Sequence, residues 1–217
     1  MSGGVVAALL AAAVSGAGGL LVLRRRAPAG VQDVLTLDEL RELTPRLTEA
    51  KRVEYLPYIN QALREWDITS YARVTAWLGQ MLFESNQFAA WREVGDASAY
   101  EGRASLGNTQ PGDGERFRGR GPVQLTGRDN YTRAGKALGL PLATQPELVE
   151  RPEVGFRTAA WFWRSGNGDL NPYADLETDD AYLAITRRIN GGTNGLEQRR
   201  NYWTRAKAAL SSRRAAT

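Results

Sequence analysis

Apolar residues recur at helical spacing through most of the chain beyond residue 35. From Leu47 to Trp66 they fall close to a 3.6-residue period, which predicts a helix that Pro57 would kink or divide. Residues 69–84 predict a second helix with one apolar side. The same patterning returns in four later stretches, 129–140, 153–164, 179–189 and 194–210. The pattern therefore predicts a mainly α fold with little sheet.

Two short signals mark expected helix starts. Thr36 is followed three residues later by Glu39, and Asn194 is followed three residues later by Glu197. A short polar side chain with an acidic residue three positions on is typical of a capping box, in which each side chain bonds the other's backbone N–H. We expect a helix to begin at each of these places.

The first residues of the chain carry a different pattern. No charged residue lies between Val5 and Leu23, and as a helix this segment would span about 28 Å, close to the ~30 Å hydrocarbon core of a bilayer. Residues 1–23 are therefore predicted as a transmembrane or signal-anchor segment, residues 24–34 as a basic linker and residues 35–217 as the folded domain. A cleaved signal peptide and a helix packed within the protein remain alternatives. The arginines at 24–26 follow the apolar run instead of preceding it, unlike those of a signal peptide, and they favour a cytoplasmic C-terminal side.

The helical pattern stops between Gly95 and Gly127. This stretch is dense in Gly, Asn, Asp and Pro, and it is too long for an idle connection in a compact domain, so it is a candidate functional loop. Within it, the sequence PVQLT at 122–126 predicts a short strand. On a strand, Gln124 and Thr126 would point to the same side.

Composition narrows the chemistry. The chain has no histidine and no cysteine, which excludes Ser-His-Asp triads, Cys-His nucleophile pairs and zinc held by His or Cys. Proton transfer would then fall to Asp, Glu, Tyr or Lys. The net charge of +4 includes the three arginines at 24–26, so the rest has 25 basic against 24 acidic residues, too balanced to indicate a nucleic-acid partner.

Glu84 and Glu93 are candidates for paired acids. Nine residues of unbroken helix would place them on opposite faces and ~13.5 Å apart along the axis, so a shared site requires the helix to end between them. The weak helix formers at 85–87 make such an end plausible. Burial beside Phe83 and Phe88 would favour the protonated carboxyl that a general acid needs, while Glu93 in a polar turn would stay ionised as a base. The alternative is that both are solvated charges at a helix end.

Several longer motifs surround these acids. They are AWLGQMLFES (76–85), YEGR (100–103), LGNTQPGDGERFRGRGPVQLTGRDNY (106–131), AAWFW (159–163) and INGGTNG (189–195). On these motifs the chain from Val74 to Trp203 resembles glycoside hydrolase family 19, which includes chitinases and the phage endolysins similar to them. The resemblance implies a lysozyme-like, two-lobed helical domain that hydrolyses a β-1,4-linked glycan by inversion, with no metal and no cofactor.

Carried over position by position, the resemblance gives Glu84 the role of general acid and Glu93 that of general base. Gln124 and Thr126 match residues that contact the sugar and position the attacking water. The remaining candidates for substrate binding are Asn130, Tyr131, Asn190 and Arg199, with Tyr100 as a ring that could stack on a sugar or simply pack.

One departure from the family pattern is Phe83, because the family usually has histidine directly before its first glutamate. The predicted substrate is bacterial peptidoglycan, with chitin as the alternative substrate. The enzyme is expected to be membrane-anchored and to act on the cell wall, either from the periplasmic side or from a virion membrane. A wall-binding protein that has kept the fold without catalysis is the third hypothesis. The sequence makes no prediction of oligomeric state.

Overall fold

The computed structural model describes residues 33–216. The predicted membrane segment at 5–23 and nearly all of the predicted linker at 24–34 lie outside these residues. Within the part of the chain that the structure describes, no helix is long and apolar enough to cross a membrane.

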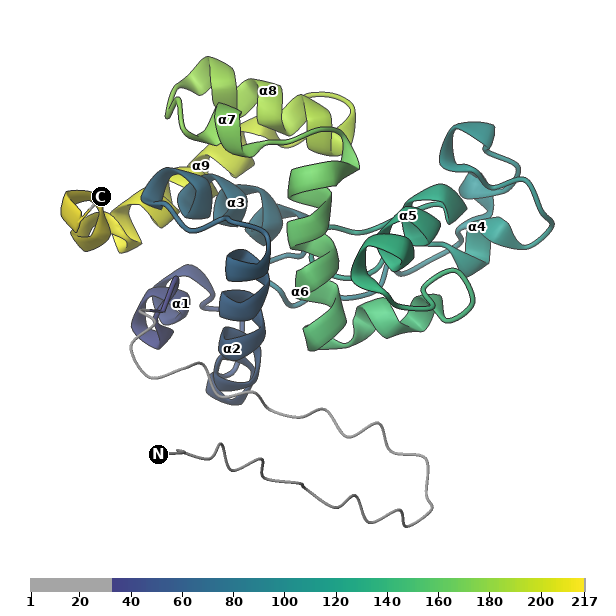
Figure 1. Cartoon of the computed structure of the whole chain (residues 1–217), viewed down its shortest axis with the longest axis horizontal. Coiled ribbons are helices and arrows are strands. Elements are labelled where there is room, and N and C mark those ends of the chain that lie inside the picture. Colours follow the sequence, from purple (N-terminus) through teal and green to yellow (C-terminus); the bar gives the residue numbers. More distant parts are fainter. Residues whose placement is uncertain (1–32, 217) are drawn as a thin grey trace, which may run out of the picture. The chain divides into compact units, whose positions relative to one another are not determined.

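Helices dominate the described chain (Figure 1). In order they are α1 (Leu37–Leu43), α2 (Glu49–Glu65), α3 (Tyr71–Glu84), η1 (Ser98–Tyr100), η2 (Ala104–Leu106), α4 (Asp113–Arg116), α5 (Arg128–Leu138), η3 (Pro146–Glu150), α6 (Pro152–Trp161), the π-helical turn η4 (Phe162–Gly166), α7 (Asn171–Ala174), α8 (Asp179–Asn190), α9 (Leu196–Ala209) and η5 (Ser211–Ala216). Over residues 33–216, β pairing is limited to two isolated bridges, Arg92 with Arg120 and Arg120 with Leu125. The prediction of a mainly α domain with little sheet is confirmed.

Polar caps set several helix starts. Thr36 and Glu39 form the predicted capping box at α1, and Thr48, Ser70 and Thr178 each accept a hydrogen bond from the third residue of the helix that follows. The second predicted capping box is wrong, because α9 begins after Gly195 and no side chain caps it. Gly195 has a φ of 68°, a left-handed conformation in which glycine is unstrained.

Helix α2 continues through Pro57 without dividing, contrary to one of the two outcomes predicted for it. Pro57 is exposed, whereas Tyr55, Ile59 and Leu63 are buried on the other side of the helix. Packing of that apolar side keeps the helix in one piece despite the missing backbone N–H.

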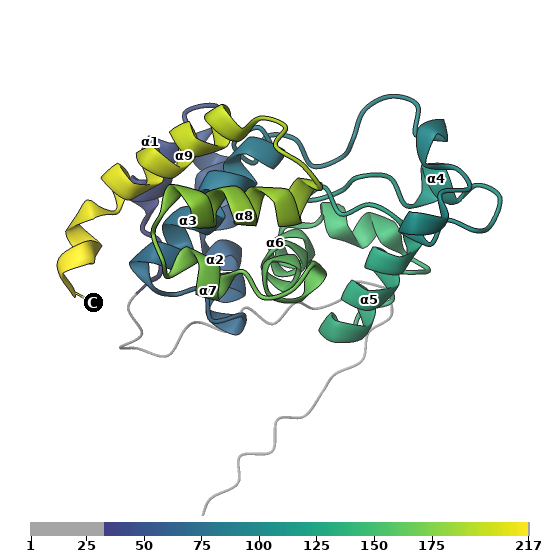
Figure 2. The ribbon, with the colours of Figure 1, turned by 90° about the horizontal axis from the view of Figure 1, so that it is seen from above.

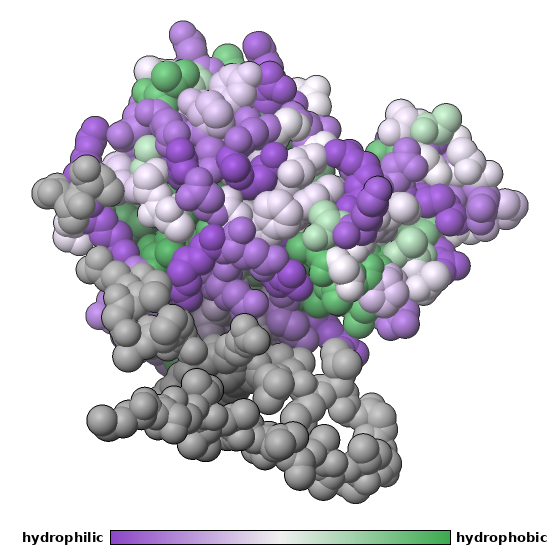
Figure 3. Space-filling model, in the orientation of Figure 1, coloured by the Kyte–Doolittle hydropathy of each residue, from purple (hydrophilic) through white to green (hydrophobic). Residues whose placement is uncertain are grey.

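The described domain has two lobes that meet at α6. Helix α6 packs against α2 on one side and against α5 and η3 on the other. Figures 1 and 2 agree in placing α4 and α5 on one side of α6 and α1, α3, α8 and α9 on the other. The space-filling view shows a largely polar surface whose outline is notched between the α4–α5 lobe and the rest (Figure 3).

Close packing holds the larger lobe together. Helix α3 lies against α9, and Gly79 permits the contact because a Cβ there would collide with the Tyr182 hydroxyl and with Trp203. The rings of Tyr182 and Trp203 stack with their centroids 4.3 Å apart. Substituting Gly79 would therefore force α3 away from the C-terminal helix.

An aromatic cluster lies where α2, α3 and α6 meet. Phe156 makes edge contacts with Tyr55, Phe88 and Trp91, and Phe88 also approaches Trp77. Phe88 and Phe156 are fully buried. These rings join the chain just after α3 to the bridging helix α6.

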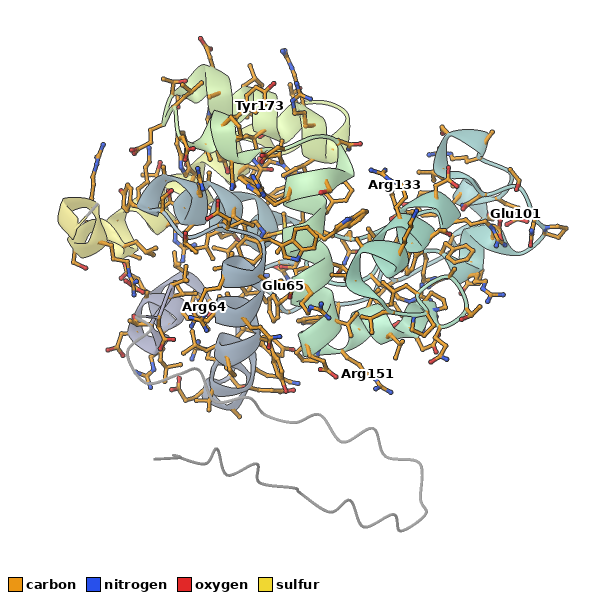
Figure 4. All side chains as sticks on the ribbon, in the orientation of Figure 1. Arg64, Glu65, Glu101, Arg133, Arg151 and Tyr173 are labelled. Atoms are coloured by element: carbon orange, nitrogen blue, oxygen red, sulfur yellow. The ribbon has the colours of Figure 1, made fainter. Side chains whose placement is uncertain are left out.

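Arginines tie distant segments together at the surface. Arg133 of α5 donates to the carbonyl oxygens of Ser165 and Gly166, at 2.7 and 2.9 Å, and Figure 4 shows it between α5 and the end of α6. At the chain ends, Arg213 donates to the Glu39 carboxylate and to the Asp33 carbonyl, 2.7 Å away. The first and last parts of the described domain are thus held to each other.

Candidate active site

Helix α3 ends at Glu84, as a shared site for the two acids requires. Ser85 is its C-cap, and the next three residues, Asn86, Gln87 and Phe88, all have positive φ, at 50°, 63° and 63°. Three successive non-glycine residues in the left-handed region are unusual and costly, and they turn the chain sharply away from the helix axis. The predicted break between Glu84 and Glu93 is confirmed.

Side chains on both flanks hold this turn. The Ser85 hydroxyl donates to the Met81 carbonyl at 2.6 Å and accepts from the Phe88 N–H at 2.8 Å. The Gln87 amide donates to the Tyr202 hydroxyl of α9 at 3.1 Å. These bonds, with burial of the Phe88 ring, offset the strain of the left-handed residues.

Glu84 is paired with Arg199. The guanidinium of Arg199 donates from Nη2 to Glu84 Oε1 at 2.6 Å, and the Glu84 side chain is 17% exposed. Phe83 lies beneath the guanidinium, 4.3 Å from ring centroid to Cζ, and its ring fills the space where a side chain at Gly195 would stand. The expected apolar surround for Glu84 is therefore replaced by an ion pair, since Phe83 contacts Arg199 and Phe88 faces the core.

Arg199 is itself buried and fully engaged. Its Nη1 donates to Gln80 Oε1 at 2.6 Å and its Nε to the Asn194 carbonyl at 3.1 Å. The side chain of Asn190 donates to the same carbonyl at 2.9 Å and accepts from the Gly192 N–H. Asn190 therefore shapes the loop that leads to α9 and lies in the same network as Glu84.

Glu93 belongs to a second network. Its Oε1 accepts from the Tyr100 hydroxyl at 2.9 Å and its Oε2 from the Gly119 N–H at 3.1 Å. Its own N–H donates to the Gly119 carbonyl at 2.9 Å. Burial and the neighbouring Glu93 carboxylate raise the pKa of Tyr100, so this phenol stays protonated and continues to donate.

Gln124 and Thr126 lie beside Glu93, although the predicted strand is wrong. Residues 122–126 form a tight turn in which Gln124 has a φ of 52° and Leu125 returns to bond with Arg120. A Cβ on Gly119 would lie 2.8 Å from Gln124 Oε1, 3.2 Å from Glu93 Oε2 and 3.4 Å from Thr126 Oγ1. Three oxygens therefore converge on Gly119, through a turn and not through strand alternation.

The next two candidates, Asn130 and Tyr131, support the backbone around this group. Asn130 donates to the Thr126 carbonyl at 2.9 Å, which fixes that residue's backbone. Tyr131 is fully buried, donates to the Arg118 carbonyl and accepts from Arg120, so its expected place on a substrate-contacting surface is corrected to a supporting one. Burial raises the pKa of Tyr131 to about 12, which keeps its hydroxyl a donor.

Polar side chains give the long loop its shape. Glu101 accepts from the N–H groups of Gly112 and Gly114, and Figure 4 places it beside α4. Buried Asn108 donates to the Tyr100 carbonyl and accepts from the Arg128 N–H, at 2.9 and 2.8 Å. The loop is therefore ordered by hydrogen bonds that end at Tyr100, the partner of Glu93.

Sequence reasoning missed two buried residues of the site. Arg118 donates to the carbonyls of Glu93 and Gly95, each at 3.0 Å, and Gln80 supports Arg199. Arg118 stands in the noted motif at 106–131 without having been chosen. Gln80 carries the clearer signal, since it is an amide on the apolar side of α3 four residues before Glu84, about one helical turn away. Its partner could not be read from the chain.

Each lobe thus contributes one carboxylate, which is held in a polar network of its own. Within residues 33–216, no group of three or more His, Cys, Asp or Glu side chains could hold a metal ion. A helical domain that supplies two separately held acids is typical of glycoside hydrolases that work with a carboxylate pair.

Comparison with known proteins agrees with this class. The family model described as chitinase class I matches residues 72–178. Endochitinase At2g43620 of Arabidopsis thaliana is 37% identical over 137 residues, covering 60% of this chain and 45% of the relative. A glycosyl hydrolase family 19 domain-containing protein of Haemophilus influenzae is 34% identical over 100 residues, 46% of each chain. Over these residues the chain is similar to glycoside hydrolase family 19.

Solved structures share the fold. Chitinase C from Streptomyces griseus HUT6037 superposes with a TM-score of 0.66 and 25% identity, covering 82% of this chain and 77% of that one. A class IV chitinase from Zea mays has a TM-score of 0.63 at 19% identity and shows the fold alone. The chain spans about half the length of the curated relatives it matches.

Proposed function

We propose that this protein hydrolyses β-1,4 bonds in a glycan of N-acetylated hexosamines by inversion, with Glu84 as general acid and Glu93 as general base. The observation that carries the proposal is the separate holding of the two carboxylates, Glu84 on Arg199 and Glu93 on Tyr100 and Gly119. Inversion needs one acid that protonates the leaving oxygen and one base that activates water on the opposite face of the sugar.

The contacts of Glu84 suit the acid. Arg199 bonds Oε1, and no hydrogen bond from a described residue reaches Oε2. Oε2 can therefore carry the proton and give it to the glycosidic oxygen. After transfer, the adjacent guanidinium stabilises the carboxylate that remains.

The contacts of Glu93 suit the base. Both of its oxygens accept hydrogen bonds, the arrangement of an ionised carboxylate. The side-chain oxygens of Gln124 and Thr126 converge on the same glycine and give a water molecule further polar partners. Such a water would be held beside the group that takes its proton.

The substrate proposed is peptidoglycan, with chitin as the second candidate. Both contain β-1,4-linked N-acetylglucosamine, and the apolar run at residues 5–23, the proposed membrane anchor, favours the first. The names of the plant relatives favour the second. Release of reducing ends from purified peptidoglycan and from chitin oligomers, with mass analysis of the fragments, decides between them.

The catalytic proposal is tested with Glu84→Gln and Glu93→Gln in the full chain. Each variant keeps side-chain size and removes proton transfer, so hydrolysis should fall by at least about a hundredfold. Binding to the insoluble glycan should persist. Unchanged hydrolysis in Glu84→Gln would refute the assignment, and binding without hydrolysis by the unaltered chain would indicate a wall-binding protein.

We also propose that residues 5–23 anchor the domain (35–217) at a membrane, facing the cell wall. The support is the uncharged apolar run of residues 5–23, which is long enough to span a bilayer as a helix. Fractionation of cells that express the full chain, compared with a chain lacking residues 1–32, tests the anchor. Equal recovery of both proteins in the soluble fraction would contradict it.

A further inference from the structure

A chain of buried polar contacts leads away from Glu84 into the larger lobe. Arg199 bonds Glu84 with Nη2 and Gln80 with Nη1, each at 2.6 Å, and Gln80 Nε2 donates to the Thr186 hydroxyl of α8 at 2.8 Å. Gln80 and Thr186 are fully buried and Arg199 is 1% exposed. Apolar side chains would fill this part of the interior at a lower desolvation cost, so packing alone does not account for three buried polar side chains here.

The direction of each bond in this chain is determined. A guanidinium can only donate, so Arg199 requires an acceptor from Gln80. An amide offers oxygen on one side and NH₂ on the other, and its orientation follows from the hydrogen bonds around it. The Thr186 hydroxyl donates its one proton to the Tyr182 carbonyl at 3.1 Å, so toward Gln80 it can only accept. Thr186 therefore holds the Gln80 amide with its oxygen toward Arg199.

We propose that Gln80 and Thr186 are positioning residues for hydrolysis: together they fix Arg199, and through it the direction in which Glu84 presents its free oxygen. The inference rests on the proposed role of Glu84 as general acid. An amide turned the other way would place NH₂ against the guanidinium, and Arg199 would lose an acceptor and shift. A displacement of about 1 Å at the acid is enough to cost up to ~100-fold in rate.

The test compares three single variants of the full chain. Thr186→Val keeps the shape of the side chain and removes the hydroxyl, whereas Thr186→Ser retains the hydroxyl. Thr158→Val is the matched control, because Thr158 is equally buried and its hydroxyl bonds a carbonyl of its own helix, Gly155, at 2.8 Å. Among the described residues, no hydrogen bond links Thr158 to the Glu84 network.

The kinetic readout uses a soluble hexamer of N-acetylglucosamine and, in parallel, sonicated peptidoglycan. We expect Thr186→Val to lower kcat by about tenfold with KM within about twofold, and Thr186→Ser to restore most of the rate. Thr158→Val should leave kcat and KM unchanged at the same folded fraction.

A second readout does not depend on activity. Carboxyl ¹³C NMR of the free protein at one fixed pH, with the Glu84 signal identified by its absence in Glu84→Gln, reports the contact between this carboxylate and Arg199. The Glu84 signal should move in Thr186→Val and stay in place in Thr186→Ser and Thr158→Val. An unmoved Glu84 signal in Thr186→Val, or a loss of rate equal to that of Thr158→Val, would overturn the proposal. If neither glycan is cleaved by the unaltered chain, the proposed function fails, and the NMR comparison still tests whether Thr186 fixes Arg199 against Glu84.

Discussion

At the scale of single residues, Gly119 is constrained by the site residues themselves. Its backbone N–H bonds Glu93, and the space above its Cα is filled by oxygens of Glu93, Gln124 and Thr126. No positive φ is recorded for this residue, so glycine is required for close approach and not for backbone freedom. Gly121 differs, because its φ of 70° calls for glycine on conformational grounds.

Gly119→Ala should therefore disable the base while the domain still folds. The added methyl would displace Gln124 and Glu93, at a cost of about 1–3 kcal/mol in stability and at least about tenfold in rate. Gly192→Ala is the control for stability, since its methyl would come no closer than 3.9 Å to Asn190 Oδ1. Thermal unfolding and glycan hydrolysis measure both effects, and wild-type activity in Gly119→Ala would contradict the geometry described for Glu93.

At the scale of elements, the 95–127 loop is held by ion pairs and amides in addition to the burial of Phe117 and Leu125. Arg128 at the start of α5 donates to both oxygens of Asp113 in α4, and the Asp113 side chain is 1% exposed. Hydrogen bonding from Arg128 lowers the pKa of Asp113. A lowered folded-state pKa means that the ionised form stabilises the fold above the unfolded value of about 3.9, and that this stabilisation is lost as pH falls through the folded value.

Asp113→Asn should consequently be less stable than the unaltered chain at pH 7, and the difference should shrink as the pH falls below about 4. Denaturant unfolding at a series of pH values measures the difference. Asp96→Asn is the comparison, since Asp96 is an exposed acid of the same loop whose pKa is lowered chiefly by hydrogen bonds from Ser98, with a smaller contribution from the charge of Arg118. A stability gap for Asp113→Asn that does not depend on pH would refute the linkage.

The elements differ in how far the chain itself predicts them. The helices at 69–84 and 179–189 were readable because apolar spacing is local, and the end of α3 was readable from the weak helix formers after Glu84. PVQLT was misread because alternation over five residues does not reveal a positive φ at Gln124. The capping box at Asn194 failed because Gly195 starts α9 in a left-handed conformation.

The sequence predicted site residues only within the motifs of the family resemblance. The family resemblance placed Glu84, Glu93, Gln124 and Thr126, and the structure brings the last three together. Gln80 and Arg199 lie 119 positions apart, and no local pattern indicates that one accepts from the other. Tyr131 was predicted to contact substrate because the sequence does not distinguish a tyrosine that lines a cleft from one that is buried behind it.

At the scale of the whole molecule, the aromatic cluster joins the lobes. Phe88 is fully buried against Trp77 and Phe156, while it also ends the left-handed turn after Glu84. Phe88→Ala should cost about 3–5 kcal/mol, and because α6 serves both lobes, unfolding should remain one cooperative transition. Denaturant unfolding followed by tryptophan fluorescence and by far-UV circular dichroism tests this. Two separated transitions would show that the lobes fold independently.

The hydrogen bonds from Arg213 to Glu39 and to the Asp33 carbonyl have a consequence for the topology of the chain. Since residues 33 and 213 touch, a short peptide could join them into a ring, and the backbone could be opened elsewhere with the same interior.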